Sequence, residues 1–279
     1  MELCTGRALP LLLRRSVERV SLFSEIASAF RAKCLPFDPR NFGTAYRLVG
    51  NTRIDRYLTG AMPWISTTGL EQLRDACVGR IPPFAARLAQ QDLANQTFIQ
   101  RALAYSNAEV FVDACKSPYR LRHLRRLAGL QLQVVHLLRD PRGVALSNMT
   151  KRGWDAALSA RLWIREQATI LRIVREFPWV TQVYYEDVCD AADETVARLS
   201  RFVGLAPHSL PADFKTVEHH ILGNWMRLRT SGAITRDTRW QTALSSRDRD
   251  AILQRLRAFL SRHETHPLSA IIRRYLEEK

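Results

Sequence analysis

The 279-residue chain has few cysteines, few lysines and no long apolar run, and each shortage argues against a class of protein. Its five cysteines show no paired metal-binding spacing, which argues against a zinc site and against a disulfide framework, and indicates reduced thiols in a cytoplasm. The longest apolar run near the N-terminus covers residues 8–13, far short of the roughly 20 residues that span a membrane. A hydrophobic content of 46% is ordinary for a folded globular protein.

Arginine supplies nearly all of the positive charge, with five lysines against thirty-seven arginines and a formal net charge of +15. Such a charge is the first sign of a nucleic-acid-binding protein. The arginines are spread along the whole chain, however, without a basic low-complexity arm or a zinc, homeodomain or RNA-binding signature. This distribution favours a small anionic ligand over a specific nucleic acid, and a basic nucleic-acid-binding protein stays open as an alternative.

The stretch from Val134 to Asn148 has the pattern of a buried strand that is followed by a helix. Asp140-Pro141 supplies a turn between the two. Because the first N–H groups of a helix are unpaired and its dipole end is positive, an anion is favoured there. Arg139 adds a permanently charged fork at the end of the strand, and Ser147 can offer a hydroxyl from the second helical turn. The segment therefore predicts a phosphate site.

At these residues the sequence resembles the sulfotransferases that use 3′-phosphoadenosine 5′-phosphosulfate (PAPS), above all the bacterial and carbohydrate-type branch. In that family an arginine at a strand end and a serine eight residues later bind the 3′-phosphate of the cofactor. The resemblance implies this role for Arg139 and Ser147. The alternative is an unrelated α/β protein that has the same strand, turn and helix.

Two further segments resemble the same family. Residues 111–118, FVDACKSP, are similar to a segment whose lysine reaches toward the cofactor or substrate, which implies that role for Lys116. Residues 219–240 are similar to the late nucleotide-wrapping loop, which implies that Arg227 and Gly232 close over the cofactor. A solvated lysine and an arginine-rich surface loop are the alternatives at these positions.

The Gly/Ser/Thr-rich loop that holds the 5′-phosphosulfate in this family has no match in the sequence. Met1-Glu2-Leu3 resembles the Gly-Glu-Leu that family members place soon after that loop, which implies an N-terminal truncation. By the same resemblance Glu2 is the candidate base, and His219 is its rival. Without the loop we expect poor sulfuryl transfer, and a non-catalytic pseudoenzyme that binds nucleotides or polyanions is a further alternative.

The predicted fold is α/β, with a P-loop-type parallel sheet that is flanked by helices and lacks its first strand and loop. We expect one domain over 1–279, in which 1–108 form a mostly helical substrate-side portion and 109–279 bind the 3′-phosphate. Predicted strands cover 109–113, 132–138 and 180–185, and predicted helices cover 83–105, 157–177, 247–262 and 267–277.

The predicted activity is transfer of a sulfuryl group from PAPS to a hydroxyl or amine of a glycan, lipid or small molecule. The resemblance to this family implies a reaction that requires no metal. The expected location is the cytoplasm, or the Golgi lumen if truncation removed an anchor. The acceptor itself depends on loop shape and is left open.

Overall fold

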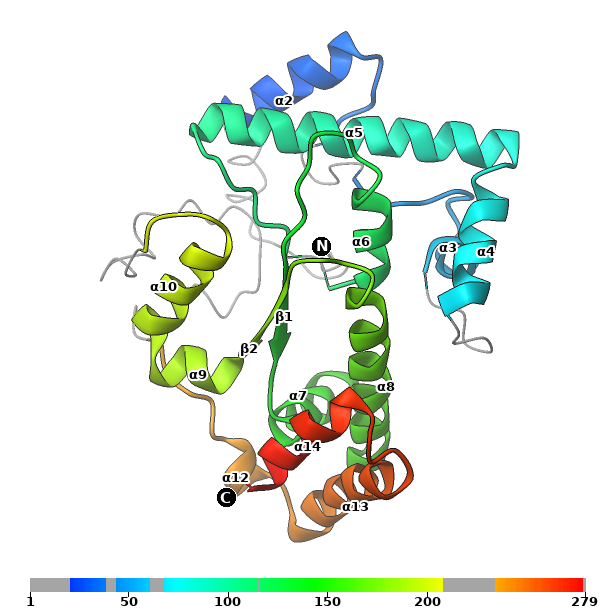
Figure 1. Ribbon diagram of the computed structural model, residues 1–279. Helices are drawn as coiled ribbons and strands as arrows, with labels where there is room; N and C mark the ends of the chain where they lie inside the picture. The colour runs from blue at the N-terminus through cyan, green and yellow to red at the C-terminus, as the bar shows by residue number, and fades with distance from the viewer. Residues whose placement is uncertain (1–20, 39–43, 61–67, 115, 208–233, 278–279) are drawn as a thin grey trace. The chain divides into compact units, whose positions relative to one another are not determined.

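The computed structural model describes residues 21–38, 44–60, 68–114, 116–207 and 234–277 (Figure 1). These residues form two compact units, one before and one after residue 132. Most of the described chain is helical, and two strands pair in parallel within the second unit. The predicted α/β class with a parallel sheet and flanking helices is therefore confirmed.

The first unit is helical, as the pattern before residue 108 predicts. Its longest helix, α5, begins with two prolines, which suit the first helical positions because the N–H that proline lacks has no partner there. α5 ends at Asn107, whose left-handed conformation (φ 47°) closes the last turn. The helices of this unit are α2 (Ser21–Ala32), α3 (Thr52–Thr59), α4 (Thr68–Val78), α5 (Pro82–Ser106) and α6 (Pro118–Leu124).

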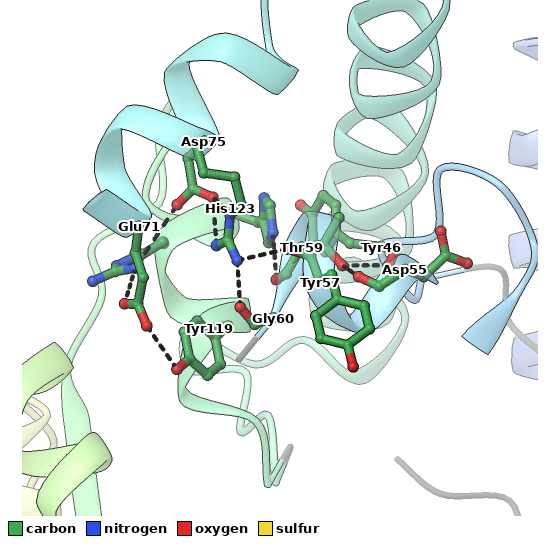
Figure 2. A network of polar contacts seen from close by, with 11 residues as sticks. Tyr46, Asp55, Tyr57, Thr59, Gly60, Glu71, Asp75, Tyr119 and His123 are labelled. Atoms are coloured by element: carbon green, nitrogen blue, oxygen red, sulfur yellow. Dashed lines mark hydrogen bonds and ion pairs between the residues drawn. The ribbon is translucent and has the colours of Figure 1, made fainter. Parts of the chain in front are cut away.

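Buried polar groups join α3, α4 and α6 in the first unit (Figure 2). The carboxylate of Asp55 accepts the backbone N–H groups of Leu48 and Val49, both at 2.8 Å, which ties the chain before α3 to that helix. Glu71 accepts a hydrogen bond from Arg122 at 2.9 Å and another from the hydroxyl of Tyr119 at 3.1 Å. This network fixes α4 against α6.

His123 makes the first unit sensitive to acid. Its ring stacks on Tyr46 with centroids 4.1 Å apart, and its Nδ1 is buried without a hydrogen-bond partner. Burial, together with the charge of Arg126, lowers the pKa of His123 to about 3. The unfolded chain binds this proton near pH 6.5, so stability falls as the pH drops from about 6.5 toward 3.

We expect this histidine to reduce the free energy of unfolding by about 1.4 kcal/mol for each pH unit within that window. His123→Phe keeps the ring contact and cannot be protonated, so its unfolding free energy should fall less steeply with acid. Urea titrations of both proteins between pH 7 and pH 4.5 measure the two slopes. Equal slopes would show that His123 does not carry the effect.

The predicted strand at 109–113 is wrong. These residues form irregular chain, in which Val112 is 81% exposed while the ring of Phe111 packs edge-on against Phe98 of α5 at 6.1 Å. A β-branched run becomes a strand only where a neighbouring strand satisfies its backbone groups. Here Phe111 instead contacts the apolar cluster between α5 and α6.

The second unit contains a parallel pair of strands, β1 (Val134–Leu138) and β2 (Val180–Tyr184), as predicted for 132–138 and 180–185. Val134 pairs with Val180, and Leu138 pairs with Tyr184, so both strands end at the same edge of the sheet. Alternate residues of β1 are buried, among them Leu138, which is fully enclosed. The residues that follow the two strands are thereby brought together.

Helices surround these strands and form the main apolar core. Trp163, Ile252, Leu268 and Tyr275 come from three different helices and pack in one cluster with Leu138. The long helices predicted in this half are confirmed. Among its described residues, the unit has the helices α7 (Pro141–Arg152), α8 (Ala156–Val174), α9 (Tyr185–Asp190), α10 (Ala192–Phe202), α12 (Trp240–Ala243), α13 (Ser246–Arg262) and α14 (Pro267–Glu277).

Candidate functional site

The turn from β1 to α7 positions Arg139. Leu138 is buried in the core at the end of β1, and α7 begins at Pro141. The backbone of Arg139 is therefore held between the strand and the helix. The N–H of Asp140 donates to the carboxylate of Glu186 at 3.0 Å, and the hydroxyl of Tyr275 donates to the same carboxylate at 3.3 Å. Glu186 therefore links the turn after β1 to the segment after β2 and holds the backbone next to Arg139.

The N-terminal end of α7 is capped by its own chain. Asp140 accepts the N–H of Arg142 at 2.7 Å, and the guanidinium of Arg142 pairs with the same carboxylate at 2.7 Å. The carboxylate is buried. The Asp140 carboxylate thus lies at the helix end where the sequence predicts a phosphate, and binding there stays a prediction. The flank of α7 offers a second place where side chains can bind an anion.

The guanidinium of Arg139 lies against that flank. A Cβ placed on Gly143 would sit 3.4 Å from both Nε and Nη2 of Arg139, so the guanidinium packs on the helix where a side chain larger than alanine would meet it. On another side the ring of Tyr185 lies 4.6 Å from the guanidinium carbon, a cation–π contact. The Arg139 side chain is 30% exposed, and Asp237 pairs with it at 2.9 Å. Arg139 is thus held in place and open to solvent.

Ser147 lies on the same flank. It follows Gly143 by four positions, and residues four apart share one face of a helix. The Cα–Cβ bonds of an α-helix lean toward its N-terminus, so the Cβ of Ser147 lies toward the turn that contains Gly143. Ser147 is half-buried. The fold therefore places Ser147 one helical turn beyond the residue against which the Arg139 guanidinium packs.

Of the remaining predicted site residues, the structure describes Lys116 alone. Lys116 is exposed on irregular chain in the first unit, just before α6. Glu2, His219, Arg227 and Gly232 lie outside the described residues. Their roles stay predictions.

Sequence reasoning missed Asp237 and Tyr185, which contact Arg139, and Arg239, which pairs with Asp237. Asp237 and Arg239 lie almost a hundred positions away in the sequence, and Tyr185 is the first residue after β2. The late segment carried a weak signal, since an aspartate, an arginine and Trp240 follow one another closely there. For Tyr185 the signal was its place after a parallel strand, because such strands end at a common edge where ligands bind.

Gly143 can be tested by adding side chains of increasing size. Gly143→Ala meets its neighbours at ordinary contact distance and removes a helix-interior glycine, so it should leave anion binding intact and stabilise the fold by up to about 1 kcal/mol. Gly143→Leu should displace the guanidinium and weaken binding of adenosine 3′,5′-bisphosphate by roughly tenfold or more. Calorimetric titration of the two variants measures this difference. Equal affinities would mean that the guanidinium does not bind the ligand from this position.

A strand-end arginine beside a helical serine is a geometry suited to binding phosphate esters. The family model described as the sulfotransferase family matches residues 66–209, just over half of the chain. The chain therefore belongs to the sulfotransferase family, whose members are sulfuryl-transferring enzymes. The match includes Arg139, Ser147 and Tyr185 and ends before Asp237.

Neither a curated protein nor a solved structure matches the chain. None of the helices in the described part of the chain is long and apolar enough to cross a membrane.

Proposed function

We propose that this protein is a PAPS-dependent sulfotransferase that moves the sulfuryl group to a hydroxyl or amine of a glycan, lipid or small molecule. The observation that carries the proposal is the shared flank of α7, where the guanidinium of Arg139 packs on Gly143 and Ser147 lies one turn further on. A guanidinium with a hydroxyl beside it supplies donors for a terminal phosphate. We assign the 3′-phosphate of the cofactor to this place.

The surroundings of Arg139 fit an anionic nucleotide. Tyr185 supports the guanidinium from one side and Gly143 from another, so little side-chain freedom is lost when a ligand binds. A net charge of +15 favours approach of a highly charged anion. When bound, PAPS supplies the activated sulfuryl group, and this chain has to orient it and neutralise its charge.

The roles of the other predicted residues belong to the same proposal. Arg227 and Gly232 close over the cofactor from the late segment, and the first 108 residues form the side on which the acceptor binds. Sulfuryl transfer needs charge neutralisation on the departing phosphate, in-line placement of the acceptor and a base. Lys116, which is exposed, is proposed to supply positive charge near the transfer point.

Glu2 is the proposed base, and His219 is the alternative. The test uses a form of the protein that transfers the sulfuryl group from labelled PAPS. In it, Glu2→Gln should abolish transfer and leave the affinity for adenosine 3′,5′-bisphosphate nearly unchanged, because the base acts on the proton of the acceptor and not on the cofactor. His219→Ala should retain turnover. Measured rates and affinities of the two variants decide, and an active Glu2→Gln with an inactive His219→Ala would reverse the assignment.

The proposed cofactor is tested by comparing three ligands in calorimetric titrations. The protein should bind adenosine 3′,5′-bisphosphate at least roughly tenfold more tightly than adenosine 5′-monophosphate, because only the former presents a 3′-phosphate to Arg139. A duplex DNA of mixed sequence should bind weakly and lose affinity steeply with salt. No preference for the bisphosphate would exclude the proposed site. Transfer from labelled PAPS then separates an enzyme from a pseudoenzyme that only binds.

A further inference from the structure

The carboxylate of Asp237 lies between two guanidinium groups. It accepts a hydrogen bond from Arg139 Nη2 at 2.9 Å and two more from Arg239 Nε and Nη2, both at 2.8 Å. The Arg239 contact is two-pronged, the geometry in which a guanidinium also binds a phosphate. Two cations therefore converge on the position of one carboxylate.

Local backbone contacts hold Asp237 at this position. Its N–H donates to the hydroxyl of Tyr185 at 3.1 Å, and its Oδ1 accepts the N–H of Arg239 at 3.2 Å just before α12 begins. The hydrogen bonds from Arg239 hold the pKa of the Asp237 carboxyl well below its ordinary value. The carboxylate thus stays charged at neutral pH and remains bound to both arginines.

We propose that Arg139 and Arg239 form a two-arginine clamp for the 3′-phosphate and that Asp237 is an internal carboxylate which the phosphate replaces. This inference rests on the proposed function and adds to it a second phosphate-binding arginine. A carboxylate presents two oxygens to a guanidinium much as a phosphate does, so both fit the same donors. Arg239 is 71% exposed and therefore has room to turn toward a ligand.

Charge balance explains why the carboxylate has to leave. The two guanidinium groups carry two positive charges, and Asp237 neutralises one of them. A phosphate dianion beside an unmoved Asp237 would place three negative charges against two positive ones, and like charges a few ångströms apart repel. Binding therefore includes the cost of breaking the contact between Arg139 and Asp237, and this contact lowers the affinity of the site.

The first test removes the charge of Asp237 and keeps its shape. Asn in Asp237→Asn can still accept the N–H of Arg239, so the turn before α12 should be preserved. We expect its affinity for adenosine 3′,5′-bisphosphate to rise on the order of tenfold above wild type. Calorimetric titration measures both proteins under the same salt conditions. A residue that only positions Arg139 would give the opposite result, a loss of affinity.

The second test isolates Arg239. In the Asp237→Asn background, a further Arg239→Ala should weaken binding roughly tenfold, because no competing carboxylate remains to be released. Arg236→Ala in the same background is the matched control, since Arg236 lies in the same segment and pairs with Asp190 at 3.2 Å. This control should change the affinity little. If Arg236→Ala and Arg239→Ala weaken binding equally, the change in affinity comes from the lower net charge of the protein, and the clamp is overturned.

The outcomes separate this inference from the proposed function. Binding by wild type with equal or weaker binding by Asp237→Asn overturns the inference and leaves the cofactor assignment standing. If Arg239→Ala does not weaken binding in the Asp237→Asn background, the two-arginine clamp is overturned and the cofactor assignment stands. Absence of binding by wild type and by Asp237→Asn overturns the cofactor assignment and the inference together.

Discussion

Arg139→Ala should lose most of the affinity for adenosine 3′,5′-bisphosphate while the protein stays folded. A hydrogen bond to a charged group contributes about 1.5–3 kcal/mol, which corresponds to a loss of roughly ten- to a hundredfold. Arg139 is the residue on which the site converges, since Gly143 and Tyr185 both contact its guanidinium. The fold should tolerate the change, because the pair with Asp237 is partly exposed and such pairs contribute at most about 1 kcal/mol.

The effect should depend on the 3′-phosphate of the ligand. Adenosine 5′-monophosphate should bind wild type and Arg139→Ala equally, because it has no group at the position assigned to Arg139. Ser147→Ala should lose only about 0.5–1.5 kcal/mol of affinity for the bisphosphate, the value of one neutral hydrogen bond. Calorimetry with both nucleotides on all three proteins makes the comparison. Equal bisphosphate affinity in wild type and Arg139→Ala would refute the site.

The sequence indicated the parts of this candidate site that are close together in the chain. Arg139 and Ser147 follow one strand within a few residues, and the spacing of a strand end and a helical turn is set by local geometry. The turn at Asp140 was predicted from local residues too, and its capping role was not, although an Asp before Pro at a helix start also signals a cap. Asp237 could not be placed, since no local rule brings it to Arg139.

The fold was predictable where the residues of a single helix indicate its length and its ends. α5, α13 and α14 have lengths and end residues that local rules specify, and the structure places each close to its predicted bounds. The strand predicted at 109–113 failed for the opposite reason. Its apolar residues suit either a strand or a segment that packs on helices, and only tertiary contacts decide between the two.

The buried ion pair between Arg122 and Glu71 shows the same limit in the first unit. Nothing in the sequence around either residue indicates a partner about fifty positions away. The Arg122 side chain is 6% exposed and that of Glu71 is 1% exposed, so water screens neither charge well. The hydroxyl of Tyr119 also donates to Glu71. The stability of this unit is therefore expected to depend on keeping both charges.

Arg122→Met should destabilise the first unit by about 3–5 kcal/mol, because it removes a buried guanidinium that neutralises the buried Glu71 carboxylate. Hydrogen exchange of the α4 and α6 amides, measured at increasing urea concentration, reports the free energy of unfolding of the unit that contains the pair. The double variant Glu71→Gln/Arg122→Met is the control. It removes the charge and keeps an acceptor for the hydroxyl of Tyr119, so it should regain most of the lost stability. If the double variant were as unstable as Arg122→Met, lost packing and not the unpaired charge would be the cause.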